Sequence, residues 1–497
     1  MGNPDFKNRY AKHKVHNWIL AVKKLADIAT TQPHAAFAAF TQSLQGQWTF
    51  LSRAMPEVSH LFQPLEDSIR YNFIQSLLKR EVNDRERDML SLPARMGGLG
   101  IYKPVEECLI SSTNSAYISA PLVRLIQRQV FDFDPRELAE AMKALRADVD
   151  KESDKRSKAK LETILTDAPE ELKLAVQAAS EKGASSWVTA SPSFDHGTVL
   201  HKGEFVDACY IRYGWTLLNL PVTCACETAF SVQHALDCKL GGLRIIQHNE
   251  VRDTIAQCMR EAGHTAVEVE PQLQPLEGEV FHYKSANKDD EARSDIKCCG
   301  FFRNMRQAYF DVKVVSPFAR SNAHLKPAQL FKQAEQQKIR EYKERILNVE
   351  QADFCPLVFT CSGGMAPKSH LVLKRLAEKL SQKQNLSFSV VSGWLRCRLS
   401  YALLRTTLLC QSHSPQEDRM RQQHRTGCRS DEDGLLTSRC QDVHITHRYH
   451  SHHHHHHHHL FATQQRTSAH HQQHHRLLRQ ATPPQTTAKQ GRFSKRR

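Results

Sequence analysis

The chain has 497 residues, of which 40% are hydrophobic, and this length allows two to four domains that each bury a core. Its 68 Lys and Arg exceed its 53 Asp and Glu, and the formal net charge of +15 excludes an acidic protein and favours a polyanionic partner. The longest apolar stretch, residues 394–409, is interrupted by arginines, and the N-terminus lacks the pattern of a signal peptide. We therefore expect a soluble intracellular protein that does not use a membrane.

A helical region is predicted for residues 1–133, because apolar residues recur at helical spacing in three segments before residue 80. The sequence L-P-A-R-M-G-G-L-G-I at residues 92–101 interrupts these helices. It lacks the order G-x-x-x-x-G-K-[ST] and therefore predicts a tight turn, not a phosphate-binding loop. Residues 134–198 are rich in Lys, Glu, Asp and Ala and predict a charged helical connector.

A structural zinc knuckle is predicted within residues 199–243. Four residues follow the spacing C-x-C-x7-H-x3-C and offer the ligands that zinc accepts in a tetrahedron: Cys224, Cys226, His234 and Cys238. The chain has 14 cysteines, which in an intracellular protein are expected to be reduced or metal-bound and not paired in disulfides. Buried free cysteines beside a histidine on a helix face are the alternative.

Residues 244–411 predict a small α/β domain that begins with a helix over residues 243–262. Two polar residues of this helix have two interpretations each. His248 is either a functional residue or a histidine at the edge of the core. Glu250 is the acidic residue that is placed to join a metal site, and a solvated glutamate is its alternative.

The strand expected over residues 309–315 carries the candidate catalytic pair. Its alternation places Asp311 and Lys313 side by side on the face opposite Phe310. A turn around residues 303–304 would bring Asp295 back beside this strand. An Asp followed by Asp-x-Lys on a hydrophobic strand is the spacing of metal-dependent nucleases of the restriction-enzyme type. A charged pair that only keeps an exposed strand face soluble is the alternative.

Three further elements follow, namely a helix over residues 328–350, a strand over 355–360 and a helix over 368–380. Together with the earlier segments they predict an α+β multi-domain protein with a small mixed sheet flanked by helices. Residues 412–497 hold 17 of the 29 histidines, eight of them consecutive at 452–459, and carry a formal charge of +8. They lack apolar periodicity and predict a disordered, basic, low-complexity tail.

In their order along the chain, these motifs resemble the C-terminal region of non-LTR retrotransposon polyproteins. The motifs are the zinc spacing, Q-H-N-E-V-R-D at 247–253, E-P-Q-L at 270–273, S-D-I at 294–296 and F-D-V-K-V-V at 310–315. Members of this family that carry these motifs have a restriction-enzyme-like endonuclease of the PD-(D/E)xK type.

The N-terminal part of the chain takes part in the same resemblance, which covers roughly residues 10–410. The segments Q-P-H-A-A-F-A-A-F, Q-P-L-E-D-S-I-R and L-P-A-R-M-G-G-L-G-I resemble the region that follows the reverse-transcriptase palm.

The chain departs from the family pattern at several places. The reverse-transcriptase signature, an aromatic residue before Asp-Asp, is absent, so we expect no polymerase activity. Gln247 stands where the family usually has arginine, and Gln272 stands where related copies often have Asp. The tail after residue 412 has no counterpart, and we expect a truncated copy of such an element.

The resemblance implies an endonuclease that nicks DNA with Mg²⁺ in the nucleus. Asp295 and Asp311 would hold the ion, Lys313 would orient or activate the attacking water, and Glu250 would be an outer ligand. A catalytically dead, zinc-dependent nucleic-acid-binding remnant is the alternative, and a relic without a stable fold is a third.

The resemblance also implies contacts with nucleic acid around this site. Lys338 and Tyr342 of the following helix, together with His248, are expected to approach the DNA. Element RNA is expected as a second partner. The sequence leaves the oligomeric state open.

Overall fold

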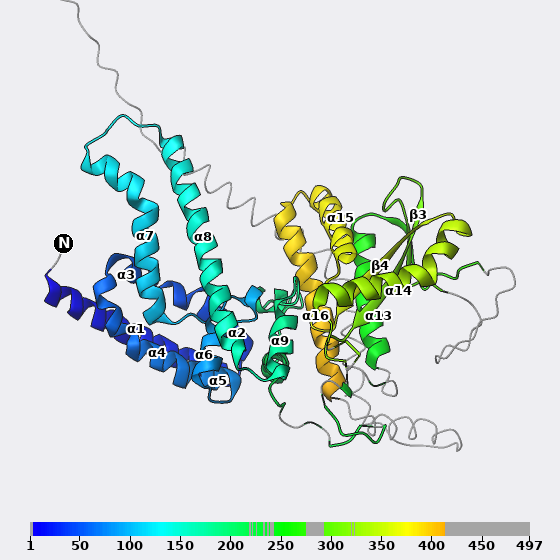
Figure 1. Cartoon of the computed structure of the whole chain (residues 1–497), viewed down its shortest axis with the longest axis horizontal. Helices are drawn as coiled ribbons and strands as arrows, with labels where there is room; N and C mark the ends of the chain where they lie inside the picture. Colours follow the sequence, from blue (N-terminus) through cyan, green and yellow to red (C-terminus); the bar gives the residue numbers. More distant parts are fainter. Residues whose placement is uncertain are drawn as a thin grey trace, which may run out of the picture. The chain divides into compact units, whose positions relative to one another are not determined.

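The computed structural model describes residues 3–217, 243–274, 293–319 and 324–412, together with 220, 222–224, 226–231, 234–235, 238 and 321–322. Apart from its first residue, the tail expected from residue 412 onward lies outside the described residues. The described residues form an α+β structure in which helices predominate around one four-stranded mixed sheet (Figure 1). None of the described helices combines the length and the apolar character that crossing a membrane requires.

The N-terminal part of the chain is helical, as predicted. Its α-helices are α1 (Pro4–Ala29), α2 (Pro33–Gln42), α3 (Thr49–Ala54), α4 (Gln63–Ser68), α5 (Gln75–Leu78), α6 (Asp84–Ser91) and α7 (Pro104–Gln127). Short 3-10 or π turns join several of them. Proline at the first turn begins α1, α2 and α7, where its missing N–H costs no hydrogen bond. Asn83 and Glu86 form a capping box that begins α6.

The glycine-rich segment at residues 92–101 is a tight turn, as predicted, and a buried arginine holds it. Arg212 of α11 (Lys202–Tyr213) donates hydrogen bonds to the carbonyl oxygens of Ala94 at 2.8 Å, Gly97 at 3.1 Å and Gly98 at 3.1 Å. A Cβ on Gly98 would lie 1.9 Å from the carbonyl oxygen of Leu92, so glycine is required there.

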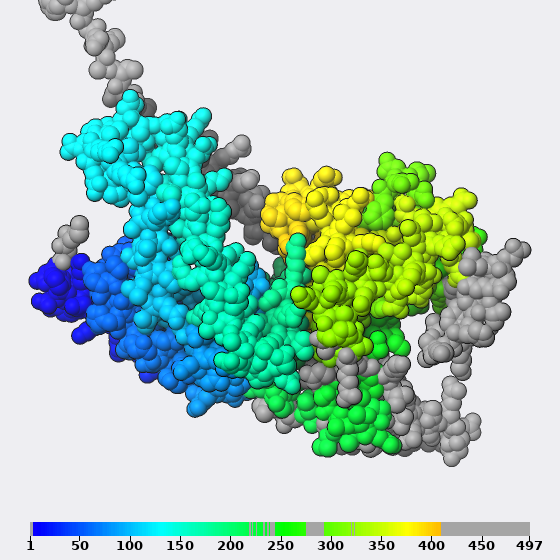
Figure 2. All heavy atoms as spheres, viewed as in Figure 1, coloured from blue at the N-terminus to red at the C-terminus, as the bar shows by residue number. Residues whose placement is uncertain are grey.

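The segment expected to be a charged connector contains α8 (Pro135–Thr166), α9 (Glu170–Ser180) and α10 (Ser186–Thr189). α8 packs against α7 but lies at the surface along most of its length, and Ile164 is its one buried residue (Figure 2). In contrast, α9 and α10 bury Val176, Trp187 and Val188 in the core of the N-terminal helices. The second half of the segment therefore belongs to that core.

Four strands form the sheet in the order β1-β2-β3-β4. The strands are β1 (Thr265–Val269), β2 (Ile296–Cys299), β3 (Gln307–Val315) and β4 (Asp353–Thr360). The first three are antiparallel neighbours, whereas β4 runs parallel to β3. The chain crosses from β3 to β4 through α14 (Pro327–Asn348), as a parallel connection requires. The sequence predicted β3, β4 and the return of β2 beside β3, but it did not predict β1.

Helices cover both faces of the sheet. α14 packs on one face, where Val315 and Val358 meet its apolar residues. The opposite face carries Phe310 and Val312 and is covered by three helices (Figure 1): α13 (Leu243–Glu261), α15 (Pro367–Gln384) and α16 (Phe388–Ser412). The alternation predicted for β3 is confirmed, but the strand is buried on both sides, with Asp311 only 3% exposed.

The last helix, α16, contributes to two hydrophobic cores. Leu395, Leu399 and Leu403 pack in the core that covers the sheet. Tyr401, Leu404 and Leu408 pack in the core of the N-terminal helices. The sequence did not predict that one helix would complete both cores.

Candidate functional site

The four residues predicted to bind zinc lie together. The ligand atoms of Cys224, Cys226, His234 and Cys238 are all within 4.8 Å of one another. Cys224 Sγ is 3.6 Å from Cys238 Sγ, and Cys226 Sγ is 3.1 Å from His234 Nε2. A tetrahedral zinc ion with sulfur at about 2.3 Å sets two sulfurs about 3.8 Å apart. This cluster can therefore hold a metal ion.

Two pieces of local structure present these ligands. A hairpin, in which Thr223 pairs with Ala229 and Cys224 N donates to Thr228 O at 2.9 Å, carries the first two cysteines. A helical turn, in which Cys238 N donates to His234 O at 2.8 Å, carries the other two ligands. The hydrogen bond between Cys226 and the Thr228 side chain lowers the pKa of that thiol to about 6, which favours the thiolate that binds metals.

β2 and β3 bring Asp295 and Asp311 together. The antiparallel register pairs Ile296 with Phe310, so Asp295 stands opposite Asp311 at the start of β2. The backbone N–H of Val312 donates to Asp295 Oδ2 at 2.5 Å, which fixes the carboxylate against β3. The predicted return of Asp295 to the strand of Asp311 is therefore confirmed.

His248 of α13 holds the other oxygen of Asp295. Its Nε2 is 2.9 Å from Asp295 Oδ1. Burial opposes a charged imidazole, but the hydrogen bond to Asp295 and the negative charges of Asp295 and Asp311 raise the pKa of His248. His248 therefore connects α13 directly to Asp295.

Glu250 has different neighbours. Burial acts to lower the pKa of the Arg398 guanidinium on α16. The negative charges of Glu261 and Glu250 are among the effects that raise this pKa. Among the described residues, the carboxylates of Glu250, Asp295 and Asp311 do not form a group whose ligand atoms all lie within 4.8 Å of one another. The role of Glu250 as an outer ligand of a metal at Asp295 and Asp311 therefore stays a prediction.

Lys338 of α14 is turned inward onto Asp311. Lys338 Nζ lies 2.9 Å from Asp311 Oδ2, and the side chains are only 17% and 4% exposed. Burial raises the pKa of Asp311 and Asp295 raises it further, whereas Lys338 opposes the rise, and the pKa is about 7. The ammonium also lies 5.1 Å from the ring centre of Tyr342. Contact of Lys338 and Tyr342 with DNA stays a prediction.

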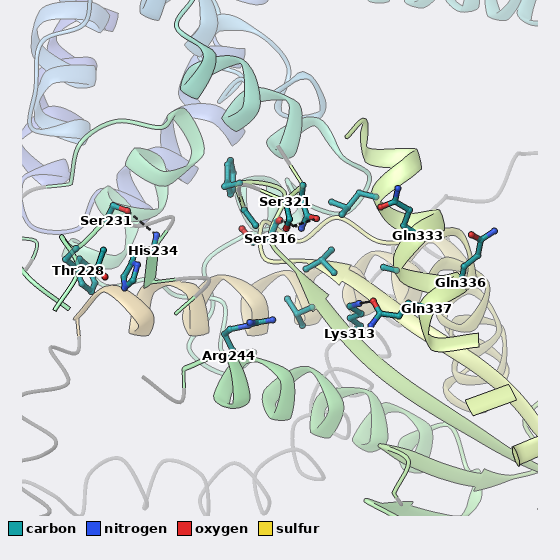
Figure 3. A pocket seen from close by; sticks show the side chains of 18 of the residues that line it. Thr228, Ser231, His234, Arg244, Lys313, Ser316, Ser321, Gln333, Gln336 and Gln337 are labelled. Atoms are coloured by element: carbon teal, nitrogen blue, oxygen red, sulfur yellow. Dashed lines mark hydrogen bonds between the residues drawn. The ribbon is translucent and has the colours of Figure 1, made fainter. Parts of the chain in front are cut away.

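Lys313 shares a face of β3 with Asp311 but has another partner on α14. Its Nζ donates to Gln337 Oε1 at 2.5 Å. Burial and the nearby charge of Lys338 lower the pKa of Lys313. A groove with a volume of about 1280 Å³ opens beside this lysine and extends to the Cys and His cluster at His234 (Figure 3).

The two glutamines that depart from the family pattern have structural partners. Gln247 is buried and donates from Nε2 to Thr407 Oγ1 at 3.0 Å, which links α13 to α16. Gln272 pairs with Arg293 in an isolated β-bridge next to β2. Both residues therefore support the frame around Asp295.

The inward position of Lys338 was missed from the sequence, although a signal was present. Lys338 follows Ala334 and precedes Tyr342 by one helical turn each, so it lies in the apolar stripe of α14. A lysine in such a stripe, opposite a strand that carries an aspartate, indicates a buried ion pair.

Comparisons with protein-family models and with curated proteins find no match to this chain.

Proposed function

We propose that residues 244–411 form a nuclease core that hydrolyses DNA phosphodiester bonds. The observation that carries the proposal is the placement of Asp295 opposite Asp311, with Lys313 on the face of Asp311. The order of elements supports it, because a helix, three antiparallel strands, a helix and a parallel strand follow one another around these residues. This order is similar to the core of restriction-enzyme-like endonucleases.

The carboxylates of Asp295 and Asp311 suit a magnesium ion, because Mg²⁺ prefers oxygen ligands. Asp311 Oδ2 is buried, and the Lys338 ammonium contacts it. Binding of Mg²⁺ at this oxygen requires Lys338 to move, since two cations repel each other strongly in a buried site. When bound, the ion supplies the positive charge that polarises the scissile phosphate and lowers the pKa of a water molecule.

The protein's own residues supply the remaining functions. His248 and the N–H of Val312 fix the two oxygens of Asp295, so this carboxylate needs little reorganisation. Lys313 carries a positive charge to the edge of the groove, where it can orient a phosphate and stabilise the negative charge that develops during attack. Lys338 keeps Asp311 neutralised until substrate and metal arrive.

A nucleic-acid-binding protein without catalysis is the second candidate. Among the described residues, the Cys and His cluster is the one group of three or more metal ligands that lie close together. The aspartates are not part of such a group, and Lys338 already balances the charge of Asp311. These observations favour a protein that retains its zinc cluster and its basic surface but has lost cleavage.

A nicking assay separates the two candidates. Supercoiled plasmid is incubated with the full chain and Mg²⁺, and the nicked form is measured. An endonuclease converts plasmid, Asp311→Asn and Lys313→Gln lose the activity, and Asp148→Asn, an exposed carboxylate of α8, retains it. If the unaltered chain does not nick but still binds DNA in a salt-sensitive manner, the second candidate is correct.

We also propose structural zinc at the Cys and His cluster and an origin in a non-LTR retrotransposon. The chemistry of three thiols and one imidazole supports zinc. The order of this cluster, α13, β2 and β3 along the chain supports the origin. Chromosomal DNA in the nucleus, and element RNA, are the partners that follow from such an origin.

A further inference from the structure

The groove beside Lys313 has a lining that suits a polynucleotide. Arg244 of α13, Lys313 of β3 and Arg340 of α14 contribute three cationic groups to it. None of the described residues that line the groove carries a carboxylate. A hollow with only positive charges attracts phosphate groups and repels no part of a nucleic-acid backbone.

One wall of the groove is a face of α14 that carries amides. Gln333, Gln336, Gln337 and Arg340 follow one another at helical spacing and are all exposed. Side-chain amides both donate and accept hydrogen bonds, so they match the edges of unpaired bases. α14 buries its other face on the sheet, so Gln333, Gln336 and Arg340 face solvent, and Gln337 pairs with Lys313 within the groove.

The other end of the groove lies at the zinc-binding cluster. Figure 3 shows Thr228, Ser231 and His234 at this end, with Arg244 between them and Lys313. Phe230 and Phe318 also contribute to the lining and offer aromatic faces on which bases can stack. A strand in the groove therefore meets the zinc-binding cluster at one end and the candidate catalytic lysine at the other.

The lining of the groove favours one strand over two. A pocket of about 300–1,000 Å³ encloses a drug-sized molecule, so a groove of about 1280 Å³ has room for a short run of nucleotides. The rings of Phe230 and Phe318 can stack only on bases that are not already stacked in a duplex.

We propose that this groove binds a single, unpaired strand of nucleic acid and leads it to Lys313. The inference rests on the proposed function only in placing a phosphate at Lys313, since binding itself requires no cleavage. The recognised chemistry is a sugar–phosphate backbone with accessible bases, which a melted DNA strand and a single-stranded RNA share.

Fluorescence anisotropy with the zinc-loaded full chain tests the proposal without Mg²⁺, so that cleavage does not contribute. The probes are a short oligothymidylate, an oligouridylate of equal length and a hairpin duplex of equal length. We expect both single strands to bind at least about tenfold more tightly than the duplex. A preference for one single strand over the other then identifies DNA or RNA as the source.

Two groove variants and a matched control locate the binding. Arg244→Gln with Arg340→Gln is expected to weaken single-strand binding about tenfold and to reduce the salt slope by about 1.4. Arg136→Gln with Arg146→Gln removes the same charge from the exposed face of α8 and is expected to change affinity less than about twofold. Gln336→Glu, a nearly isosteric change at an exposed position, is expected to weaken binding as well if the double variant does not fold.

Equal affinity for the duplex, or equal affinity in the groove variants and the α8 control, would overturn the proposal. The outcome is distinguishable from failure of the nuclease proposal. If the chain binds single strands through the groove but does not nick plasmid, the groove proposal stands and the nuclease proposal fails. If the chain nicks plasmid in an Asp311-dependent manner but the groove variants bind single strands as tightly as the unaltered chain, the nuclease proposal stands and the groove proposal fails.

Discussion

Asp311 and Lys338 form an ion pair with little solvent around it, so each controls the charge state of the other. Asp311 is a carboxyl with a pKa of about 7, which means that its ionised form depends on the ammonium 2.9 Å away. Removing one partner of a buried pair leaves an uncompensated group, whereas removing both does not.

Lys338→Met is expected to lower the free energy of unfolding by roughly 1–3 kcal/mol near neutral pH, because Asp311 then loses its partner or must take up a proton. Lys338→Met combined with Asp311→Asn is expected to cost less than the sum of the single changes. Urea denaturation followed by tryptophan fluorescence measures all three variants. Strictly additive costs would show that the two side chains are not coupled.

Glu181, which follows α9, is a second carboxyl whose burial changes its charge. It accepts a hydrogen bond from Thr360 Oγ1 at 2.8 Å, and burial raises the pKa of Glu181 to about 7, although this hydrogen bond opposes the rise. A raised pKa in the folded state means that the protonated form stabilises the fold. This stabilisation is complete below the ordinary pKa of 4.5 and is lost as the pH rises through about 7.

In the unaltered chain, the free energy of unfolding is expected to fall by up to roughly 3 kcal/mol through Glu181 as the pH rises from 4.5 to 7. Glu181→Gln is expected to abolish this decrease. The free energy of unfolding at several pH values in this window, compared between the variant and the unaltered chain, measures the effect. Identical pH dependence in both proteins would contradict the role of Glu181.

At the scale of single elements, the strands differ in how far the sequence could predict them. β3 carries a strong alternation of Phe310, Asp311 and Val312, and its prediction was correct. β1 alternates Val267, Glu268 and Val269, but an alternation within only five residues is too short to identify a strand from the sequence. It forms because β2 offers a free edge and α13 packs against it.

The candidate site also contains some positions that the sequence could predict and some contacts that it could not. The positions of Asp295, Asp311 and the four metal ligands follow from spacing, because each lies in a short segment whose geometry is local. The contacts of His248 and Lys338 depend instead on how α13 and α14 rotate against the sheet, and this rotation is set by packing over the whole domain. Spacing within one helix does not contain that information.

The hairpin that carries Cys224 and Cys226 would be joined to His234 and Cys238 by a bound metal ion. We expect one zinc ion per chain in protein that is purified without chelators, and Cys238→Ser is expected to lower this content. Cys299→Ser, in β2 and outside the cluster, is the matched control and is expected to retain the metal. Atomic absorption measures the metal content. Equal content in the two variants would exclude Cys238 as a ligand.

At the scale of the whole molecule, α16 links the sheet to the N-terminal helices. Its residues Tyr401, Leu404 and Leu408 are 3%, 9% and 8% exposed, because the N-terminal helices cover them. Tyr401 Oη also donates to the carbonyl oxygen of Thr198 at 2.8 Å. One helix therefore contributes to both cores, and the domain boundary near residue 243 stays a prediction.

Residues 244–412 produced alone are expected to lack a cooperative thermal transition or to self-associate, since the apolar side of α16 would be exposed. The full chain serves as the reference, and size-exclusion chromatography together with thermal melting measures both proteins. A monomeric segment that melts cooperatively would show that the sheet and its helices fold without the N-terminal part.

The position of α16 also affects the order of events during synthesis. Domains generally fold one after another as the chain leaves the ribosome, with the N-terminal part first. Here the early helices remain incomplete until residues 401–408 are available, and the sheet waits for residues 395–403 of the same helix. A chain that is released before residue 395 is made would expose apolar residues of both cores at the same time. Chaperones and proteases recognise such exposed apolar surface.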